Sequence, residues 1–415
     1  MSPRDLRGAS ASDPFVRPVP GILAGMVALG TALFAPLLPL GMAPLFIAGA
    51  VLAGGTVLWR LRRLPPLDRG LLLPLLLFWL AGGLSIAWTP VPIDGLAQTI
   101  TFAYEFVPGI LLIALTAGLD PERRQRIERW LLIGIAVGLA VYAVEVLADQ
   151  PLYSLGKLGD ATHLGRIRAL NRPAVILAML VWPAALLLHR RGFVRTAWLL
   201  PAGYFLLTLA TPSASAVAGV AAGLVVLALA LWSPGAARAV IGTVLVAGFA
   251  FGVPIAHGLH RVGVAEMEEL PWSFRHRVRI WQYAADRVAE NPLFGWGLDA
   301  SRSFPAEGMD GLPLHPHNLF LQSLLELGVV GSALLLWFLL VLLDRTRRLG
   351  AAQPYALAAF ASALVIANFA YGAWQTWWIC SLLLTVFLLV LVAAGGAGSA
   401  GGVSAGAPDS RGPRP

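Results

Sequence analysis

Three arginines and two histidines in the one long polar segment of this chain are its residues best suited to chemistry. Arg275, Arg277 and Arg279 lie two residues apart, and His315 and His317 follow in the sequence HPHN. A guanidinium group donates paired hydrogen bonds from a planar fork and keeps its charge, which suits it to a diphosphate. A neutral imidazole can accept the proton of a hydroxyl group. These residues predict a site that holds an anionic group and activates an alcohol.

His317 is the candidate general base. It follows Pro316 where the polar segment turns into an apolar run, and Asn318 comes directly after it. The backbone N–H groups at a helix start disfavour a charged imidazolium, so the ring is expected to be neutral near pH 7. The alternative is an interfacial histidine that only caps the helix. His315 is the nearest rival for the role of the base.

Arg172 is a further candidate for binding the anionic group. It opens an apolar run in the sequence LNRPAVILAMLVWPA, and Arg168 precedes it in the polar segment 149–171. From the local residues alone, Arg172 also fits an anchor whose side chain reaches the membrane surface. The three arginines of the longer polar segment likewise fit general binding of lipid headgroups.

The rest of the chain is strongly apolar. Of its 415 residues 58% are apolar and 13% are charged, and the mean hydropathy is +0.75, so a water-soluble fold could not bury this material. Apolar runs recur at lengths of about 20 residues, enough to cross about 30 Å of hydrocarbon. The sequence therefore predicts an all-α polytopic membrane protein. The single cysteine excludes an internal disulfide and a cysteine metal site.

About twelve transmembrane helices are expected, with one large outer loop that contains surface helices. The expected spans are 19–40, 42–59, 70–88, 97–118, 130–148, 172–189, 196–212, 215–232, 239–257, 318–343, 354–372 and 377–395. Nine spans thus lie within 19–257, the loop with the candidate chemistry is 258–317, and three spans lie within 318–395. Residues 1–18 are polar and proline-rich, residues 396–415 are rich in Gly, Ala, Pro and Ser, and both ends are expected to be disordered.

Arginines in the short loops predict the orientation. They all fall on one side of the expected spans: Arg4, Arg7, Arg17, Arg60, Arg62, Arg63, Arg69, Arg123, Arg124, Arg126, Arg129, Arg190, Arg191, Arg195, Arg238, Arg345, Arg347 and Arg348. By the positive-inside rule this side and both termini are cytoplasmic, and 258–317 lies outside. The net charge of +8 therefore reflects membrane topology and gives no reason to expect a nucleic-acid partner.

The polar residues of the spans favour a site at the outer surface. Asn318, Gln322 and Glu326 recur every four residues and define one face of a helix that starts there. Ionisable groups inside a bilayer are costly and usually line a cavity. A transporter would typically place them near the midplane between repeated halves. Neither that depth nor a repeat is evident in this sequence.

A surface helix is predicted over 273–290. Its apolar residues are close to helical spacing, and Trp272 and Trp281 are expected to anchor it at the membrane interface. Arg277 and Trp281 stand four residues apart and so share a face of the helix. Asn291-Pro292 and the glycines that follow are expected to end it.

Three motifs resemble those of one known family. RxxxW at Arg277–Trp281, NPLFGWGLD at 291–299 and HNLFLQSLLELGVVG at 317–331 resemble the O-antigen ligase and polymerase superfamily of bacterial cell-envelope proteins. The pair Asn171-Arg172 at the opening of a span is also similar, as is the arrangement of about twelve spans with one large periplasmic loop. Each motif alone is weak, whereas together they are distinctive.

The resemblance implies an O-antigen ligase-like glycosyltransferase that is inverting and needs no metal. It would move a glycan from undecaprenyl diphosphate to a hydroxyl of lipid A-core at the periplasmic face of the bacterial inner (plasma) membrane. His317 would deprotonate the acceptor, while Arg277 and Arg172 would hold the diphosphate and stabilise its charge. Further substrate contacts are expected from Arg275, Arg279, Trp281, Asn318, Arg168 and Glu326.

The expected partners are the undecaprenyl-diphosphate-linked donor, the acceptor and membrane lipids. No metal or other cofactor is expected, since the outer loops hold no Asp-rich cluster. A polymerase, whose acceptor is a carrier-linked repeat unit, is the first alternative. A flippase or transporter of lipid-linked glycans is the second, and it would need paired half-repeats. A purely structural scaffold would not need His317, Arg277 and Arg172 together.

Overall fold

The computed structural model describes residues 19–61, 65–116, 119–156, 163–304 and 315–395. Within these residues every regular element is a helix, which confirms the predicted all-helical class. The two ends that were expected to be disordered, 1–18 and 396–415, lie outside the described residues.

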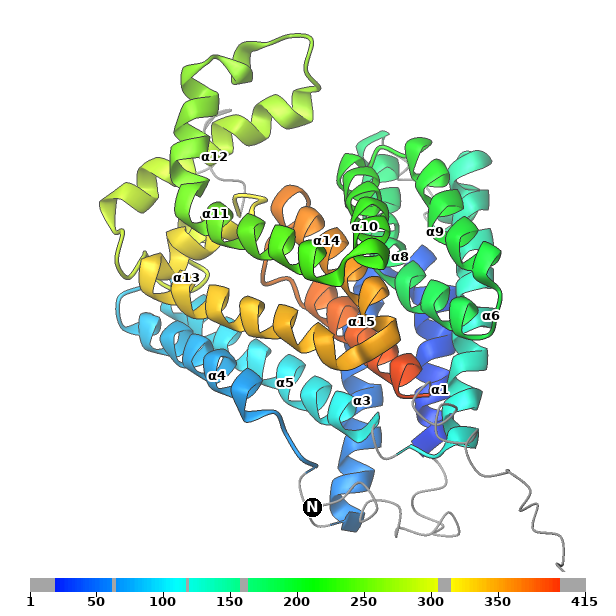
Figure 1. Cartoon of the computed structure of the whole chain (residues 1–415). Helices are drawn as coiled ribbons and strands as arrows, with labels where there is room; N and C mark the ends of the chain where they lie inside the picture. The colour runs from blue at the N-terminus through cyan, green and yellow to red at the C-terminus, as the bar shows by residue number, and fades with distance from the viewer. Residues whose placement is uncertain (1–18, 62–64, 117–118, 157–162, 305–314, 396–415) are drawn as a thin grey trace, which may run out of the picture.

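The helices follow one another along the chain with short connections, and Figure 1 shows their arrangement. The first part contains α1 (Val19–Leu29), η1 (Gly30–Phe34), α2 (Ala35–Leu37), η2 (Pro39–Gly41), α3 (Met42–Leu61), α4 (Arg69–Leu84), η3 (Ser85–Ala87), α5 (Pro92–Leu115), α6 (Pro121–Leu147), α7 (Pro151–Gly156), α8 (His163–Arg190) and α9 (Val194–Leu209). The second contains α10 (Ala214–Trp232), α11 (Pro234–Arg261), η5 (Val264–Glu266), α12 (Trp272–Glu290), η6 (Ala300–Ser303), α13 (Leu319–Arg345), η7 (Thr346–Ala352), α14 (Gln353–Phe369) and α15 (Thr376–Ala394).

Ten helical segments of the described chain are long and apolar enough to cross a membrane. One of them, Leu319–Phe369, contains both α13 and α14, and α9 is apolar but only 16 residues long. The protein is therefore a multi-pass membrane protein by the length and hydropathy of its helices. The finer count of about twelve spans stays a prediction.

Polar caps mark the starts of several long helices. The side chains of Asp68, Asp120, Ser233 and Asn318 each accept a hydrogen bond from a backbone N–H group in the first turn of α4, α6, α11 and α13. Proline follows two of these caps directly, where its missing N–H group costs nothing. Short polar connections thus fix where the apolar helices begin.

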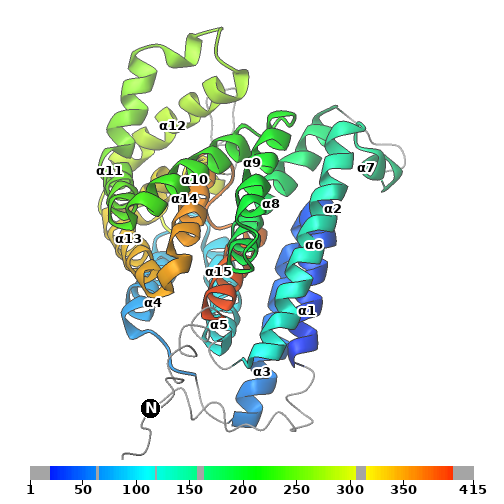
Figure 2. The ribbon, with the colours of Figure 1, turned by 45° about the vertical axis from the view of Figure 1, so that its right-hand side comes forward.

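Helix α8 is the most enclosed of the candidate spans, with 83% of its apolar window buried. It packs against α6, α9, α14 and α15, and Figure 2 shows it inside the bundle. Helices α1 and α6 lie side by side on one flank, and α4 and α13 lie together on the other (Figure 2). Because α8 is surrounded by other helices, most of its side chains face protein.

Helices α10 and α14 pack closely against each other, and both contact α8. Gly223 of α10 leaves room for Trp182 of α8, whose indole N–H donates to the Ser362 hydroxyl at 3.0 Å. The same hydroxyl donates to the Gly219 carbonyl at 2.8 Å. These contacts fix the packing of α8, α10 and α14 at a level where none of the three has a candidate site residue.

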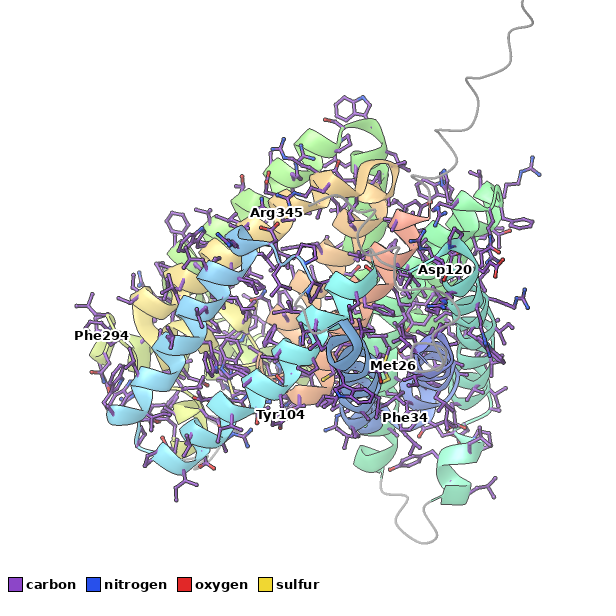
Figure 3. The ribbon with its side chains drawn as sticks, turned by 90° about the horizontal axis from the view of Figure 1, so that it is seen from below. Met26, Phe34, Tyr104, Asp120, Phe294 and Arg345 are labelled. Carbon is purple, nitrogen blue, oxygen red and sulfur yellow. The ribbon has the colours of Figure 1, made fainter. Side chains whose placement is uncertain are left out.

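At the end of the bundle opposite the candidate site, Arg345 joins α13 to α4. Its guanidinium contacts the Asp68 carboxylate at 2.6 Å, and Arg348 contacts the same carboxylate at 2.6 Å. Figure 3 is a view of this end, and it labels Arg345 and, across the bundle from it, Asp120. The hydrogen bond from Arg345 lowers the pKa of Asp68, so the carboxylate stays charged at neutral pH.

The outer part of α11 and the whole of α12 extend beyond the neighbouring helices (Figure 1). Helix α12 agrees with the helix predicted over 273–290, and its buried face includes Val278, Trp281 and Ala285. Trp272 is 58% exposed, as an interfacial anchor would be, whereas Trp281 is only 5% exposed. The prediction that Trp281 anchors the helix in the interface is wrong, because this ring packs into protein.

Helix α13 is broken at Gly328, which has φ 62° and ψ −165°. The segment 291–299, whose sequence is NPLFGWGLD, packs into the break and supplies the missing hydrogen-bond partners. The bonds run from Val329 N to Pro292 O, from Val330 N to Leu293 O, from Trp296 N to Leu325 O and from Gly297 N to Glu326 O, at 2.7–3.1 Å.

Both segments approach so closely that glycine is required on each side. A Cβ atom on Gly328 would clash with the Leu293 carbonyl, and one on Gly295 would meet the backbone of Glu326. Both glycines also have positive φ, which disfavours other residues. The glycines of the 291–299 motif thus join the outer segment to a membrane helix.

Candidate functional site

His317 is held by a strong hydrogen bond from its ring. The Nδ1 atom lies 2.6 Å from the carbonyl oxygen of Ala370, in the turn between α14 and α15. A carbonyl can only accept, so Nδ1 carries the proton and Nε2 carries the free lone pair. The backbone of His317 has φ 55°, an uncommon conformation for a residue other than glycine. The turn therefore fixes the ring in the tautomer that a general base acting through Nε2 requires.

Burial lowers the pKa of His317 to about 4, and the charges of Arg277 and His276 act in the same direction. The hydrogen bond to Ala370 opposes these effects in part. The ring is therefore neutral at pH 7, as expected from the sequence. The main cause of the lowered pKa is the loss of water around the ring. The sequence alone suggests the N–H groups at the helix start as the cause of the neutral ring.

Arg277 lies on the face of α12 that meets the loop carrying His317. Its Nη1 donates to the carbonyl of Ser273 at 3.0 Å, and burial lowers its pKa without removing its charge. One turn later, the Trp281 indole N–H donates to the Pro316 carbonyl at 3.0 Å. Among the described residues no carboxylate forms an ion pair with Arg277. Its charge is therefore available to an anion beside His317.

Arg172 reaches the same region from α8. Its guanidinium carbon lies 6.0 Å from the centre of the Trp377 ring, a cation–π contact with α15. Within the described part of the chain its Nε atom is buried without a hydrogen-bond partner. The side chain thus turns toward α15 and the protein, which does not fit an anchor reaching the membrane surface.

Tyr371 lies within reach of the charges of both arginines, and it was not identified from the sequence. Burial raises the pKa of its hydroxyl, while the charges of Arg172 and Arg277 both act to lower it. Its ring meets that of Trp377 edge to face, with 4.8 Å between the ring centres. The polar residues that flank this outer turn, Asn368 and Gln375, were the only sequence signal that could have drawn attention to it.

His315 lies beside His317, with ring centres 4.3 Å apart. The indole N–H of Trp377 donates to Gln375 Oε1 at 2.7 Å, which orients the amide so that its nitrogen faces His315 Nε2 at 3.3 Å. Burial lowers the pKa of His315 to about 3. Because its Nε2 already accepts this bond, His315 is the less suitable base of the pair.

Asn318 and Glu326, both expected to contact substrate, are engaged within the protein. The Asn318 side chain caps α13 by accepting from Leu321 N at 3.0 Å. Glu326 is fully buried and accepts from Gln322 Nε2, Asp299 N and Trp374 Nε1 at 2.8–3.0 Å. The predicted face with Gln322 is confirmed by their hydrogen bond. The predicted substrate contact is not supported for Glu326, since its oxygens bind protein groups.

The three arginines of α12 do not form one cluster. Arg279 donates to the Ala265 carbonyl at 3.3 Å and lies 4.0 Å from Glu266 Oε1, so it faces η5. Arg275 is one turn before Arg279 on the same face, and Arg277 points about 160° away. The expected grouping is therefore corrected: only Arg277 joins His317. The side chain of Arg168 lies outside the described residues.

The positive charge at the site comes from Arg277 and Arg172. Within the described chain, no group of three or more His, Cys, Asp or Glu residues is placed to hold a metal ion. The arrangement offers a neutral imidazole with a free Nε2 atom, two guanidinium groups and a tyrosine hydroxyl on which both guanidinium charges act. Such a set can bind an anion and accept a proton from a nearby alcohol.

Comparison with known proteins shows which family the chain resembles. Residues 197–336 match the family model described as O-antigen ligase, a range that includes both Arg277 and His317. The chain is 26% identical over 306 residues to "Putative polysaccharide ligase RC0486" of Rickettsia conorii, which covers 70% of this chain and 73% of that protein. A "Putative polysaccharide ligase" of Rickettsia bellii is 26% identical over 288 residues, covering 65% and 68%.

A third relative, "Putative polysaccharide ligase RP358" of Rickettsia prowazekii, is 26% identical over 280 residues, covering 64% of this chain and 67% of that protein. These similarities extend well beyond the motifs, over most of the membrane-embedded chain. The chain thus matches the O-antigen ligase family model over residues 197–336 and is similar, over about two thirds of its length, to proteins named putative polysaccharide ligases.

Proposed function

We propose that this protein is a membrane glycosyltransferase that moves a glycan from undecaprenyl diphosphate to a hydroxyl of lipid A-core. The observation that carries the proposal is the convergence of His317, Arg277 and Arg172. The first presents a neutral ring with Nε2 free, and the other two present charges without an ion-pair partner among the described residues. The match of residues 197–336 to the O-antigen ligase model supports the choice of a lipid-linked glycan as substrate.

In the proposed reaction, His317 Nε2 accepts the proton of the acceptor hydroxyl. The acceptor oxygen then attacks the anomeric carbon of the donor sugar, on the face opposite the diphosphate. The bond from this carbon to the diphosphate oxygen breaks, and its electron pair leaves with the diphosphate. One displacement of this kind inverts the configuration of the sugar. Arg277 and Arg172 hold the diphosphate and stabilise the charge that develops on it.

The proposed reaction needs no metal ion. Glycosyl transfer from a diphosphate requires positive charge on the leaving group, and a divalent cation is one source of it. Two guanidinium groups supply the same charge with directed hydrogen bonds. In this chain the two guanidinium groups are those of Arg277 and Arg172. Transfer that continues in the presence of a chelator would support the proposal.

The proposed topology has twelve spans, both termini in the cytoplasm and the site at the periplasmic face of the inner membrane. Counting α13 and α14 separately and including α9 brings the ten segments to this number. The candidate site lies near the starts of α8 and α13. The distribution of arginines in the short loops predicts that this end faces the periplasm. Cysteine labelling at 277 and at 347 should therefore occur from opposite sides of the membrane.

The decisive experiment is transfer in proteoliposomes. The purified protein receives undecaprenyl diphosphate-linked glycan, with lipid A-core or a second carrier-linked repeat unit as the acceptor. Glycan on lipid A-core is expected, with and without chelator, and His317→Ala should abolish it. Elongated carrier-linked glycan would identify a polymerase instead. Movement of the donor across the bilayer without any transfer would indicate a flippase and overturn the proposal.

A further inference from the structure

The turn between α14 and α15 contacts both histidines of the site. The carbonyl of Ala370 accepts the hydrogen bond from His317 Nδ1 at 2.6 Å. Gly372 packs so closely on the other histidine that a Cβ atom there would lie 2.8 Å from His315 Cδ2. Tyr371 stands between these two contacts, so its backbone is fixed at the centre of the site.

The ring of Tyr371 is placed by the aromatic residue that supports Arg172. It meets the Trp377 ring at 4.8 Å and 86°, and the Arg172 guanidinium lies 6.0 Å from the centre of that ring. Arg277 acts on the tyrosine hydroxyl from the side of α12. Arginines from α8 and α12, two elements far apart in the sequence, thus both act on this one hydroxyl group.

The electrostatics define the protonation state of the hydroxyl. Burial raises the pKa of Tyr371 above its ordinary value, and the two arginine charges offset this only in part. The group is therefore a neutral phenol at pH 7 and can donate a hydrogen bond. A neutral donor adds a contact to an anion without adding a third buried positive charge.

We propose that the Tyr371 hydroxyl donates a hydrogen bond to the diphosphate of the donor, between the guanidinium groups of Arg172 and Arg277. This inference rests on the proposed function. The bond strengthens as the sugar–oxygen bond breaks and its electron pair moves onto the diphosphate. Tyr371 keeps its own proton throughout, and the proton of the acceptor goes to His317. Tyr371 is then a catalytic residue that stabilises the leaving group.

Other contacts hold the turn, so the hydroxyl is not needed for folding. Ala373 N donates to Gln322 Oε1 at 2.8 Å, and Trp374 Nε1 donates to Glu326 Oε2 at 2.8 Å. The edge-to-face contact with Trp377 involves the ring of Tyr371, which phenylalanine preserves. Tyr371→Phe is therefore expected to fold normally and to lose only the proposed hydrogen bond.

The test compares Tyr371→Phe with wild type and with Tyr104→Phe in proteoliposomes. Tyr104 lies on the exposed flank of α5 (Figure 3), where its hydroxyl donates to Thr101, so it is a matched control. Loss of one hydrogen bond to a charged group predicts a fall in kcat of about 10-fold to 100-fold for Tyr371→Phe. The control should keep the wild-type rate, and the melting temperatures should be equal.

Binding of undecaprenyl diphosphate, followed by tryptophan fluorescence, separates this inference from the proposed function. This product carries the full charge of the leaving group, so Tyr371→Phe should weaken its binding by about 10-fold. Such weakening supports the contact even if wild type transfers no glycan to any acceptor tested. A variant with wild-type kcat and wild-type product binding would overturn the proposal. So would a lower melting temperature, since it would give the hydroxyl a structural role.

Discussion

The Nδ1 atom of His317 lies 2.6 Å from the carbonyl oxygen of Ala370, 53 residues further along the chain. This bond joins the start of α13 to the turn before α15 and fixes which ring nitrogen can act as a base. The backbone of His317 has a φ of 55°, which is uncommon outside glycine. The reactive atom therefore depends on the packing of the last three helices and not on the local loop alone.

Replacing His317 by alanine should abolish most transfer activity while the protein remains folded. A general base contributes about 10²-fold to 10⁴-fold to a rate, so a loss of this size is expected for His317→Ala. His260→Ala, at the exposed end of α11, is the matched control and should behave as wild type. Transfer assays in proteoliposomes measure both. Wild-type rates for His317→Ala would assign the base elsewhere, with His315 as the first candidate.

The opposite faces of α12 should respond differently to the same change. Arg277→Lys keeps the charge but loses the planar fork, so kcat/KM should fall by about 10-fold to 100-fold. Arg279 lies beside η5, so the kcat/KM of Arg279→Lys should stay within about 2-fold of wild type, because an exposed ion pair contributes little. Steady-state kinetics with the lipid-linked donor would show this. Equal losses in both variants would contradict the separation of the two faces.

The pH dependence of the reaction should report a buried histidine. Burial lowers the pKa of His317 to about 4 in the free protein. The base is active when neutral, so kcat/KM should be level from about pH 6 to 8 and fall only toward about pH 4. The bound diphosphate favours the charged ring and raises its pKa, so kcat should begin to fall at a higher pH than kcat/KM. A fall in kcat/KM centred near pH 6.5 would indicate an exposed histidine instead.

Gly328→Ala should damage the junction between α13 and the outer segment. The new Cβ atom would meet the Leu293 carbonyl, and the φ of 62° is unfavourable for alanine. Strain of this kind costs about 1–3 kcal/mol, so the melting temperature and the transfer rate should both fall. Gly203→Ala, in open space on α9, should keep wild-type stability. A wild-type melting temperature for Gly328→Ala would show that the junction can relax.

The sequence predicts the local features of the site well. Apolar runs predict the helices, and the spacing of Arg277 and Trp281 correctly predicts that they share a face of α12. The regular spacing of Gln322 and Glu326 likewise predicts their contact. Each of these relationships follows from the period of a single helix.

Contacts between distant elements were not predictable in this way. The partner of His317 is a backbone carbonyl, which any residue provides, so no side-chain signal marks Ala370. Tyr371 is an ordinary tyrosine in an outer turn until α8 and α12 bring two arginines to it. Trp272 and Trp281 fit an interfacial anchor equally well from the sequence, and only the packing of the loop at Pro316 distinguishes them.

The backbone bonds at the break of α13 join the segment 291–299 to this helix, so the two are expected to fold as one cooperative unit. Expressed as a separate soluble fragment, the outer portion would lose the carbonyl and amide partners that α13 supplies. Chimeras made between relatives should therefore exchange 291–299 together with the matching half of α13. A junction placed between them would combine a 291–299 segment and an α13 from different proteins, and their backbone hydrogen bonds would then be expected to fit less well.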